Sequence, residues 1–264
     1  MAGVEIGQEG KPAAERGGAL RTVAEHGAVM TLIDHLSELR RRIAISILAL
    51  VVGSVVGFLL SDHLLDILRA PIGNQPLTYL ELGGAFSIRL KLGVMVGIVL
   101  AFPVVAWQLW SFVSPGLTPH ERRIARPWVP LMVVFFAIGV GVAYAILPLA
   151  ASFLRSFEIP GVLQSMLTAE AYFGFVSMLF LAFGVVMQFP IVIVVLNRIG
   201  ILPVARLRSS RRYVFLGILI FAVVVTPGGD PFSPSVMTLV MYALYEFTIL
   251  LIGRTARKTP AGDA

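Results

Sequence analysis

The chain contains no cysteine and few charged residues. Without cysteine it has no disulfide, no iron–sulfur cluster and no thiolate metal site. Charged residues make up 14% of the 264 residues and hydrophobic residues 57%, whereas a soluble domain carries roughly a quarter charged residues. The hydrophobic residues lie in long blocks that lack Asp, Glu, Lys and Arg. The composition therefore excludes an ordinary soluble protein and indicates one that crosses a membrane several times.

The patterns typical of metal and nucleotide sites are also missing. The four histidines are scattered without the spacing of metal ligands, and the chain has neither a glycine-rich phosphate loop nor a His-Glu-x-x-His pattern. We therefore predict no metal, no cofactor and no enzymatic activity. The formal net charge of +6 is better interpreted from where the cations fall along the chain than as a nucleic-acid-binding surface.

Six apolar segments can each form a membrane-spanning helix, which needs about 20 residues to cross a bilayer core of ~30 Å. The sequence predicts an all-α membrane protein with spans at about 43–60, 92–113, 128–154, 171–196, 213–226 and 234–252. The fifth span is short, because its residues cover only ~21 Å as a helix, so the bilayer around it is expected to be thinned. Residues 1–30 and 254–264 are predicted to be tails on either side of a membrane domain, 31–253.

The distribution of Lys and Arg predicts the orientation of the chain. With six spans, 17 of the 21 Lys and Arg residues lie on the side that holds both termini, and four lie on the opposite side. Cytoplasmic loops carry such an excess of positive residues, so both termini are predicted to be cytoplasmic. Prolines inside the spans can each bend a helix, which favours a curved bundle. They are Pro103, Pro130, Pro148 and Pro190.

Two acidic residues lie within the basic segments on the predicted cytoplasmic side. Glu38 precedes Arg42 by four residues, so the bland interpretation is an ion pair within an interfacial helix. Glu121 follows Thr118 in a capping-box pattern, and Phe112 before it is typical of an interfacial aromatic residue. The alternative is that the two acids bind a cationic ligand. The local sequence by itself favours the ion pair for Glu38, whereas capping and ligand binding are compatible for Glu121.

Three further polar residues lie within or beside the last spans. Gln188 lies about 12 Å below the membrane surface, where an amide needs a partner, and an interhelical hydrogen bond is slightly favoured over a site for an incoming helix. Glu246 lies in the sixth span, and acids within a membrane are functional candidates. The alternative is that it extends toward Arg254, although eight residues is a long reach. Asp230 or Ser233 is expected to cap the sixth helix.

Taken together, these segments resemble the TatC family, the core membrane component of the twin-arginine protein translocase. The resemblance extends from about Leu32 to Gly253. It is carried by four segments in order along the chain: His35-Leu-Ser-Glu-Leu-Arg-Arg-Arg42; Trp110-Ser-Phe-Val-Ser-Pro-Gly-Leu117 with His120-Glu-Arg-Arg123; Phe183-Gly-Val-Val-Met-Gln-Phe-Pro190; and Thr226-Pro-Gly-Gly-Asp-Pro231.

The resemblance implies a bacterial receptor in the cell membrane for export signals that bear paired arginines. The family's binding site would correspond here to Glu38 and Glu121, with Arg40, Phe112 and Arg122 as neighbours. The resemblance also implies export driven by the proton-motive force, self-association in a larger complex within membrane lipid, and binding of single-span partners of the TatA and TatB types along the last two helices. The partner contacts would fall at Thr226, Asp230 and Glu246.

Two positions depart from the family pattern. Many members have Glu where this chain has Gln188, which can form hydrogen bonds but cannot ionise. Pro234 stands where Gln is frequent, so a polar contact from that side chain is absent. A secondary transporter of a small solute is the main alternative function, but the spans show no internal repeat and few polar residues near the midplane. An intramembrane enzyme is disfavoured because the spans hold no nucleophile–base pair.

Overall fold

The computed structural model describes residues 32–73, 77–116, 122–123, 126–157, 168–198, 200–227 and 229–256. In this part of the chain the regular secondary structure is helical, apart from an isolated β-bridge between Thr78 and Thr168. The chain divides after Ile43 into two units, and each is described by itself. The prediction of an all-α fold is confirmed for the residues described.

Five helical segments are long and apolar enough to cross a membrane, and they coincide with five of the six predicted spans. The remaining span is helix α10 (Arg211–Val225), whose 15 residues form a helix about 22 Å long. It is therefore shorter than a bilayer core of ~30 Å, as the sequence predicts. The five segments are His35–Leu59, Gly84–Val113, Trp128–Arg155, Ala169–Arg198 and Phe232–Gly253.

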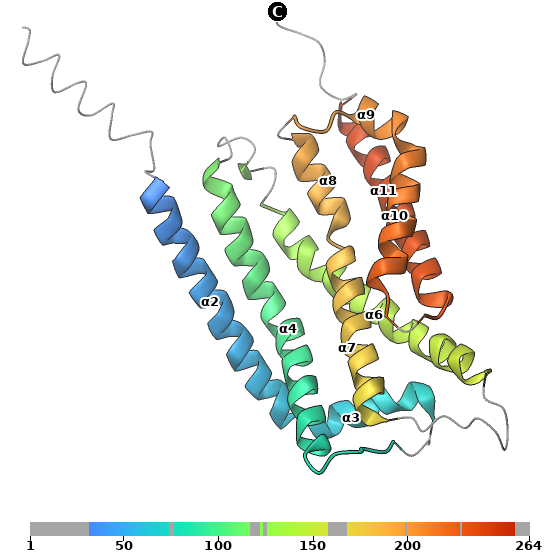
Figure 1. The fold of residues 1–264 in the computed structure, drawn as a ribbon. Coiled ribbons are helices and arrows are strands. Elements are labelled where there is room, and N and C mark those ends of the chain that lie inside the picture. Colours follow the sequence, from blue (N-terminus) through green and yellow to red (C-terminus); the bar gives the residue numbers. More distant parts are fainter. Residues whose placement is uncertain are drawn as a thin grey trace, which may run out of the picture. The chain divides into compact units, whose positions relative to one another are not determined.

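Helix α2 (Leu32–Leu59) is followed at once by a short helix, α3 (Ser61–Arg69), which the sequence analysis did not predict. Figure 1 shows α3 lying across the end of the second unit at which α4 (Gly84–Val113) and α7 (Ala169–Val186) begin. We call this the α3 end. The turn between α10 and α11 stops short of the level of α3 in the same view, which agrees with the shortness of α10.

Two tyrosines hold the last turn of α3. The Tyr172 hydroxyl of α7 donates a hydrogen bond to the Leu68 carbonyl oxygen at 2.6 Å. The Tyr144 hydroxyl of α6 (Trp128–Arg155) donates to the Ile67 carbonyl oxygen at 3.1 Å. The last carbonyl groups of a helix have no donor within it, so these two hydroxyls complete the end of α3 and fix it against α6 and α7.

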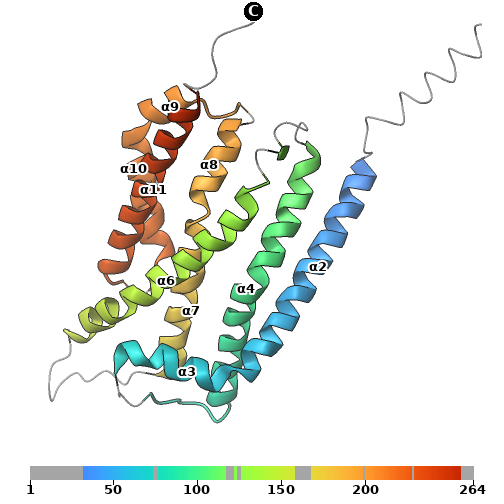
Figure 2. The same ribbon diagram turned by 180° about the vertical axis from the view of Figure 1, so that it is seen from behind.

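Helices α10 and α11 (Phe232–Ala256) form an antiparallel hairpin, seen from behind in Figure 2. Short helix α9 (Val204–Ser209) joins α10 to α8 (Phe189–Arg198). The Tyr245 hydroxyl of α11 donates a hydrogen bond to the Leu207 carbonyl oxygen of α9 at 2.6 Å. We call this region, where α4 and α8 end and α10 begins, the α9 end.

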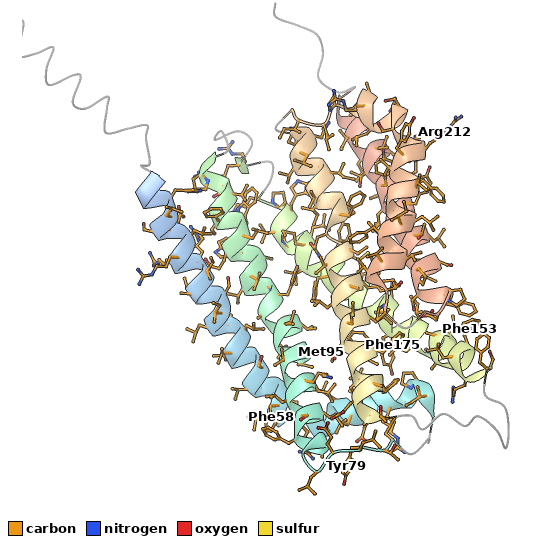
Figure 3. The ribbon with its side chains drawn as sticks, in the orientation of Figure 1. Phe58, Tyr79, Met95, Phe153, Phe175 and Arg212 are labelled. Carbon is orange, nitrogen blue, oxygen red and sulfur yellow. The ribbon has the colours of Figure 1, made fainter. Side chains whose placement is uncertain are left out.

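Four glycines bring α2 and α4 into close contact. A Cβ atom at Gly53 would lie 2.8 Å from the Gly97 carbonyl oxygen, and one at Gly57 would lie 2.6 Å from the Gly93 carbonyl oxygen. Small residues four positions apart on both helices are a common means of close helix packing in membranes. Phe58 lies beside α4 near the α3 end (Figure 3), with its ring edge to face against an α4 phenylalanine 6.2 Å away.

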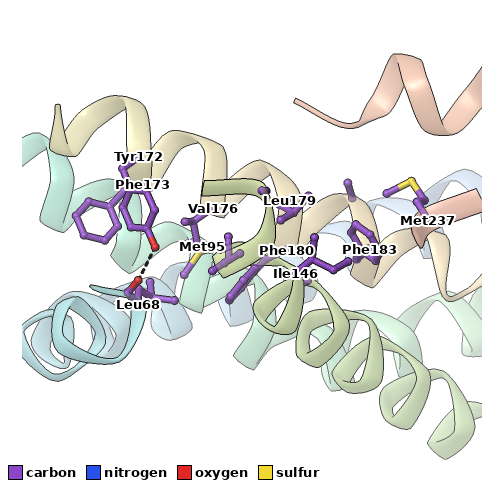
Figure 4. Packing of buried hydrophobic residues seen from close by; sticks show 14 of the residues in the cluster. Leu68, Met95, Ile146, Tyr172, Phe173, Val176, Leu179, Phe180, Phe183 and Met237 are labelled. Carbon is purple, nitrogen blue, oxygen red and sulfur yellow. Dashed lines mark hydrogen bonds between the residues drawn. The ribbon is translucent and has the colours of Figure 1, made fainter. Parts of the chain in front are cut away.

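Helix α7 lies at the centre of the main hydrophobic core. The membrane-crossing segment that contains it, Ala169–Arg198, includes an apolar 18-residue stretch that is 61% buried, the largest share among the five such segments of the described chain. Its apolar side chains pack against α4 and α6 (Figure 4). The cluster includes Phe173, Val176, Leu179, Phe180 and Phe183 of α7, Leu92 and Met95 of α4, and Ile146 and Leu147 of α6.

The fourth span is divided beside Pro190, one of the four prolines predicted to bend a helix. Helix α7 ends at Val186, and α8 begins two residues later at Phe189. Pro190 accounts for the break because it has no N–H group to donate to the Val186 carbonyl oxygen. By contrast, Pro103 and Pro148 lie within the continuous helices α4 and α6.

Candidate functional site

Glu38 lies in α2, within the first unit of the chain. Its Oε1 accepts hydrogen bonds from Arg42 Nε at 3.1 Å and Arg42 Nη2 at 2.5 Å, so the ion pair predicted from the spacing is present. Its Oε2 is buried and accepts no hydrogen bond from any residue that the structure describes. The carboxylate therefore keeps an acceptor for a further donor. Arg40, two residues away on the same helix, is exposed.

Arg122 is fixed to the end of α4. Its Nε and Nη2 donate hydrogen bonds to the Ser114 carbonyl oxygen at 3.1 Å and 2.8 Å. Phe112 lies half-buried in the last turn of α4, two residues before Ser114. Glu121 lies outside the residues described, so its predicted capping role stays a prediction. The structure therefore places Phe112 and Arg122 at the same end of α4, within the second unit.

Gln188 lies in the break between α7 and α8. Its Nε2 donates hydrogen bonds to the Gly184 carbonyl oxygen at 3.3 Å and, across to α6, to the Met132 carbonyl oxygen at 3.2 Å. The Gly184 carbonyl needs this donor because the Gln188 backbone N–H bonds to Val185 instead. The predicted interhelical hydrogen bond is confirmed. Gln188 Oε1 is buried without a partner in the described part of the chain.

Of the two residues predicted to cap α11, the structure shows Asp230 in that role. Its Oδ1 accepts a hydrogen bond of 2.7 Å from the Ser233 backbone N–H, and the Thr226 hydroxyl donates to the Ala222 carbonyl oxygen at the end of α10, also at 2.7 Å. Asp230 is 3% exposed, and its Oδ2 has no hydrogen-bond partner among the described residues. Thr226 and Asp230 therefore shape the turn between α10 and α11.

Glu246 pairs with a residue that the sequence analysis did not connect with it. Its Oε2 accepts a hydrogen bond from Arg211 Nη2 at 2.8 Å, and its Oε1 accepts one from the Tyr242 hydroxyl at 3.2 Å. Arg211 begins α10, and Arg212 beside it extends outward in Figure 3. The carboxylate therefore meets a counter-ion at the first residue of α10, at the α9 end. The side chain of Arg254 lies outside the part of the chain that the structure describes.

The predicted site residues of the second unit fall into separate places. Phe112, Arg122 and Glu246 lie at the α9 end, Gln188 lies in the interior, and Thr226 and Asp230 lie in the turn between α10 and α11. The described residues contain no group of His, Cys, Asp and Glu that could hold a metal ion.

Comparison with known proteins identifies the family. The model of the Sec-independent protein translocase protein (TatC) matches residues 34–239, which is most of the chain. The chain belongs to the TatC family. TatC proteins of Carboxydothermus hydrogenoformans and Deinococcus radiodurans are 34% and 35% identical to it. The first alignment covers 84% of this chain and 92% of the relative, and the second covers 83% and 84%.

Solved structures agree with this assignment. A crystal structure of the twin-arginine translocase receptor TatC superposes with a TM-score of 0.71 at 33% identity, covering 85% of this chain and all of that one. A second crystal structure of the TatC receptor, in detergent, gives the same TM-score at 32% identity, with 82% of this chain covered. This TatC family member is thus a multi-pass membrane component of a Sec-independent protein translocase, related to bacterial proteins.

Proposed function

We propose that this chain is the receptor that binds paired-arginine signal peptides of folded precursor proteins. The residues that bind the signal peptide are Glu38 and Arg40 of the N-terminal segment, Phe112 in the last turn of α4, and Glu121 and Arg122 between α4 and α6. Both segments face the cytoplasm, because 17 of the 21 Lys and Arg residues fall on that side of a six-span chain. The likeness to crystal structures of the twin-arginine translocase receptor supports this function.

The observation that carries the proposal is the state of the Glu38 carboxylate. One oxygen is bound by Arg42, while the other is buried without a donor among the described residues. Leaving a buried acceptor without a partner costs about 1–3 kcal/mol. A guanidinium group from a signal peptide is a strong donor for such an oxygen. Glu38 is therefore prepared to accept a second arginine without losing the first.

Glu121 supplies the second carboxylate. It directly precedes Arg122, whose guanidinium group donates hydrogen bonds to the Ser114 carbonyl oxygen at the end of α4. The residue next to Glu121 is therefore held at the end of α4. Two carboxylates suit two guanidinium groups, and arginine permits the bidentate geometry that lysine lacks. The surrounding arginines repel a ligand with a single added cation, which sharpens the requirement for a pair.

The same proposal includes partners within the membrane. Single-span proteins of the TatA and TatB types bind along α10 and α11, with Thr226, Asp230 and Glu246 at or near the contact, and copies of the chain associate in a larger complex. Transport uses the proton-motive force. The shortness of α10 supports this placement, because a thinned bilayer beside a short helix favours association with another helix.

Site-specific photocrosslinking tests the binding surface. A photoreactive amino acid at position 38 or 121 should crosslink to a precursor with paired arginines and much less to the same precursor with paired lysines. Position 81, an exposed glutamate just before α4 at the α3 end, is the control and should crosslink to neither. Equal crosslinking of the two precursors from positions 38 and 121 would count against the proposal.

Charge reversal provides a second test. Glu121→Lys should abolish binding of the twin-arginine precursor, because it replaces an acceptor for a guanidinium group with a cation. Glu81→Lys makes the same change of charge at the α3 end and should leave binding intact. Undiminished binding by the Glu121 variant would overturn the assignment.

A further inference from the structure

A groove of about 640 Å³ lies between α4 and α7 toward the α3 end. Its size falls within the range of small-molecule sites. Val94 and Met95 of α4 and Met178 and Leu181 of α7 line it, and Figure 3 shows Met95 between the two helices. Val94, Met178 and Leu181 are 41%, 49% and 42% exposed. The groove therefore opens sideways, toward the lipid that surrounds a membrane protein.

One cation lies in the wall of this groove. A Cβ atom at Gly174 of α7 would lie 3.7 Å from Lys91 Nζ, so the ammonium group of α4 reaches across to α7. Lys91 forms no ion pair or hydrogen bond with any residue in the described part of the chain. By contrast, Arg89, on the same helix two residues earlier, pairs with Asp62 at 2.6 Å.

Lys91 lies at the level of the membrane boundary. Helix α4 has 30 residues and is about 45 Å long, which exceeds a bilayer core of ~30 Å. The uncharged part of α4, Leu92–Val113, spans about 33 Å, so Lys91 is the first charged residue beyond it. The groove continues from Lys91 past Val94 to Ile98, roughly 10 Å into the apolar part.

We infer that this groove binds one phospholipid with an anionic headgroup, from the leaflet at the α3 end, with an acyl chain between α4 and α7 and the phosphate beside Lys91. The side chain of Ser87, one turn closer to the α3 end, also lines the groove and lies where it can donate a hydrogen bond to the phosphate. In the orientation proposed above, this is the outer leaflet. The site is distinct from the residues proposed to bind signal peptides.

The dimensions favour a lipid over a transmembrane helix as the occupant. A helix with side chains is about 10 Å across, so a stretch equal to the depth of the groove would need roughly 800 Å³, more than the 640 Å³ present. An ammonium group at the boundary also suits a phosphate, because membrane-facing Lys residues extend toward headgroups. An extended acyl chain is narrower than a helix and fits between α4 and α7.

Glu170 is the acidic residue closest to the groove on α7, one turn before Gly174. Its Oε1 lies 3.5 Å from the position that a Cβ atom on Gly84 would occupy, and it forms no ion pair with Lys91. Its negative charge lies on the headgroup side of the groove and opposes an anionic ligand. Glu170→Gln should therefore increase binding of the lipid.

Native mass spectrometry of the full chain can measure the retained lipid. The protein is released from nanodiscs that contain equal amounts of phosphatidylglycerol and phosphatidylcholine with identical acyl chains. We expect one phosphatidylglycerol to be retained in preference to phosphatidylcholine. Lys91→Gln should reduce that retention about five-fold, and Lys91→Arg should keep it. Equal retention of the two lipids by the unaltered chain would overturn the inference.

Arg89→Gln is the matched control for charge. It removes a cation from the same end of the same helix. If the lipid were held only by non-specific attraction to positive charge, its retention would therefore fall equally in Arg89→Gln and Lys91→Gln. The inferred site requires Arg89→Gln to retain the lipid as the unaltered chain does. Equal losses in the two variants, or no loss in Lys91→Gln, would contradict the site.

Filling the groove tests the position of the acyl chain. Gly174→Leu places a side chain beside Lys91 without changing the charge and should lower retention. Met178→Trp narrows the exposed wall and serves if the first variant fails to fold, as judged by thermal unfolding in detergent. A photoreactive residue at position 94 should give adducts of lipid mass. Retention unchanged by the filling variants that fold, or polypeptide adducts in place of lipid adducts, would overturn the inference.

Discussion

Arg211 Nη2 donates a hydrogen bond of 2.8 Å to Glu246 Oε2, and this pair joins the first residue of α10 to α11. Glu246 follows Phe232, the first residue of α11, by fourteen positions. Arg211 precedes Val225, the last residue of α10, by the same number. The two residues therefore lie at the same level at the open end of the hairpin, about 21 Å from its turn. Glu246, which the sequence places within the sixth span, is thus paired with the first residue of the short helix α10.

Breaking this pair should weaken the hairpin. The two side chains are 45% and 28% exposed, so screening by solvent limits the contribution of the pair to about 1 kcal/mol. Arg211→Gln and Glu246→Gln should each lower the midpoint of thermal unfolding in detergent by about 2–4 °C. Tyr242→Phe, which removes only the 3.2 Å hydrogen bond to the same carboxylate, should have a smaller effect. A larger loss from Tyr242→Phe would contradict this account.

Adding a side chain at Gly97 should separate α2 from α4. A Cβ atom there would collide with Ser54 of α2, and overpacking of this kind costs about 1–3 kcal/mol. Gly97→Ala should therefore lower the free energy of unfolding by that amount. Gly141→Ala is the control, because a Cβ atom at that position meets no atom within 4 Å. Similar stabilities for the two variants would show that the close approach does not contribute.

Removing the hydroxyl of Tyr172 should loosen α3. The Leu68 carbonyl oxygen that it binds is buried with it, and an acceptor left without a donor costs about 1–3 kcal/mol. Tyr172→Phe should therefore increase hydrogen exchange of the backbone amides in α3. Tyr144→Phe, which removes an exposed hydrogen bond of 3.1 Å to the neighbouring Ile67 carbonyl, should increase exchange less. The reverse order would argue against the role of burial.

Replacing the Gln188 side chain with one that lacks an N–H donor should destabilise the protein. Gln188→Leu leaves the Met132 and Gly184 carbonyl oxygens without the amide that binds them, at an expected cost of about 1–2 kcal/mol. Gln188→Glu should be destabilising when ionised, because a carboxylate has no N–H group to donate. Thermal unfolding of both variants in detergent measures the loss. Full stability of Gln188→Leu would show that the two carbonyls do not depend on the side chain.

The long apolar segments were predictable from sequence because hydrophobic length alone specifies a membrane helix. The helices extend beyond the predicted spans where charged residues follow the apolar run. Helix α4 begins at Gly84 rather than near Leu92, and its first turns carry Arg89 and Lys91. Helix α3 escaped prediction because its nine residues include Asp62, His63, Asp66 and Arg69 and contain no long apolar run.

Contacts between distant residues were harder to predict. The pairing of Arg211 with Glu246 spans 35 positions and depends on how α10 and α11 align, which the sequence does not specify. The hydrogen bonds of Gln188 depend likewise on the packing of α6 against α7. The close approach of α2 and α4, in contrast, had a readable signal in the spacing of Gly53 with Gly57 and of Gly93 with Gly97. Capping by Asp230 was predictable because it is local.

The most direct test of the proposed receptor function is a double-mutant cycle between Glu38 and the signal peptide. Binding of a purified twin-arginine precursor is measured for the unaltered chain and for Glu38→Gln, each with the unaltered signal and with one arginine of the pair replaced by glutamine. If an arginine binds Glu38, the two changes should be coupled by about 1.5 kcal/mol, roughly ten-fold in affinity. The cycle is carried out for each arginine of the pair in turn. If the loss of binding free energy from Glu38→Gln simply adds to the loss from replacing either arginine, direct recognition by Glu38 is contradicted.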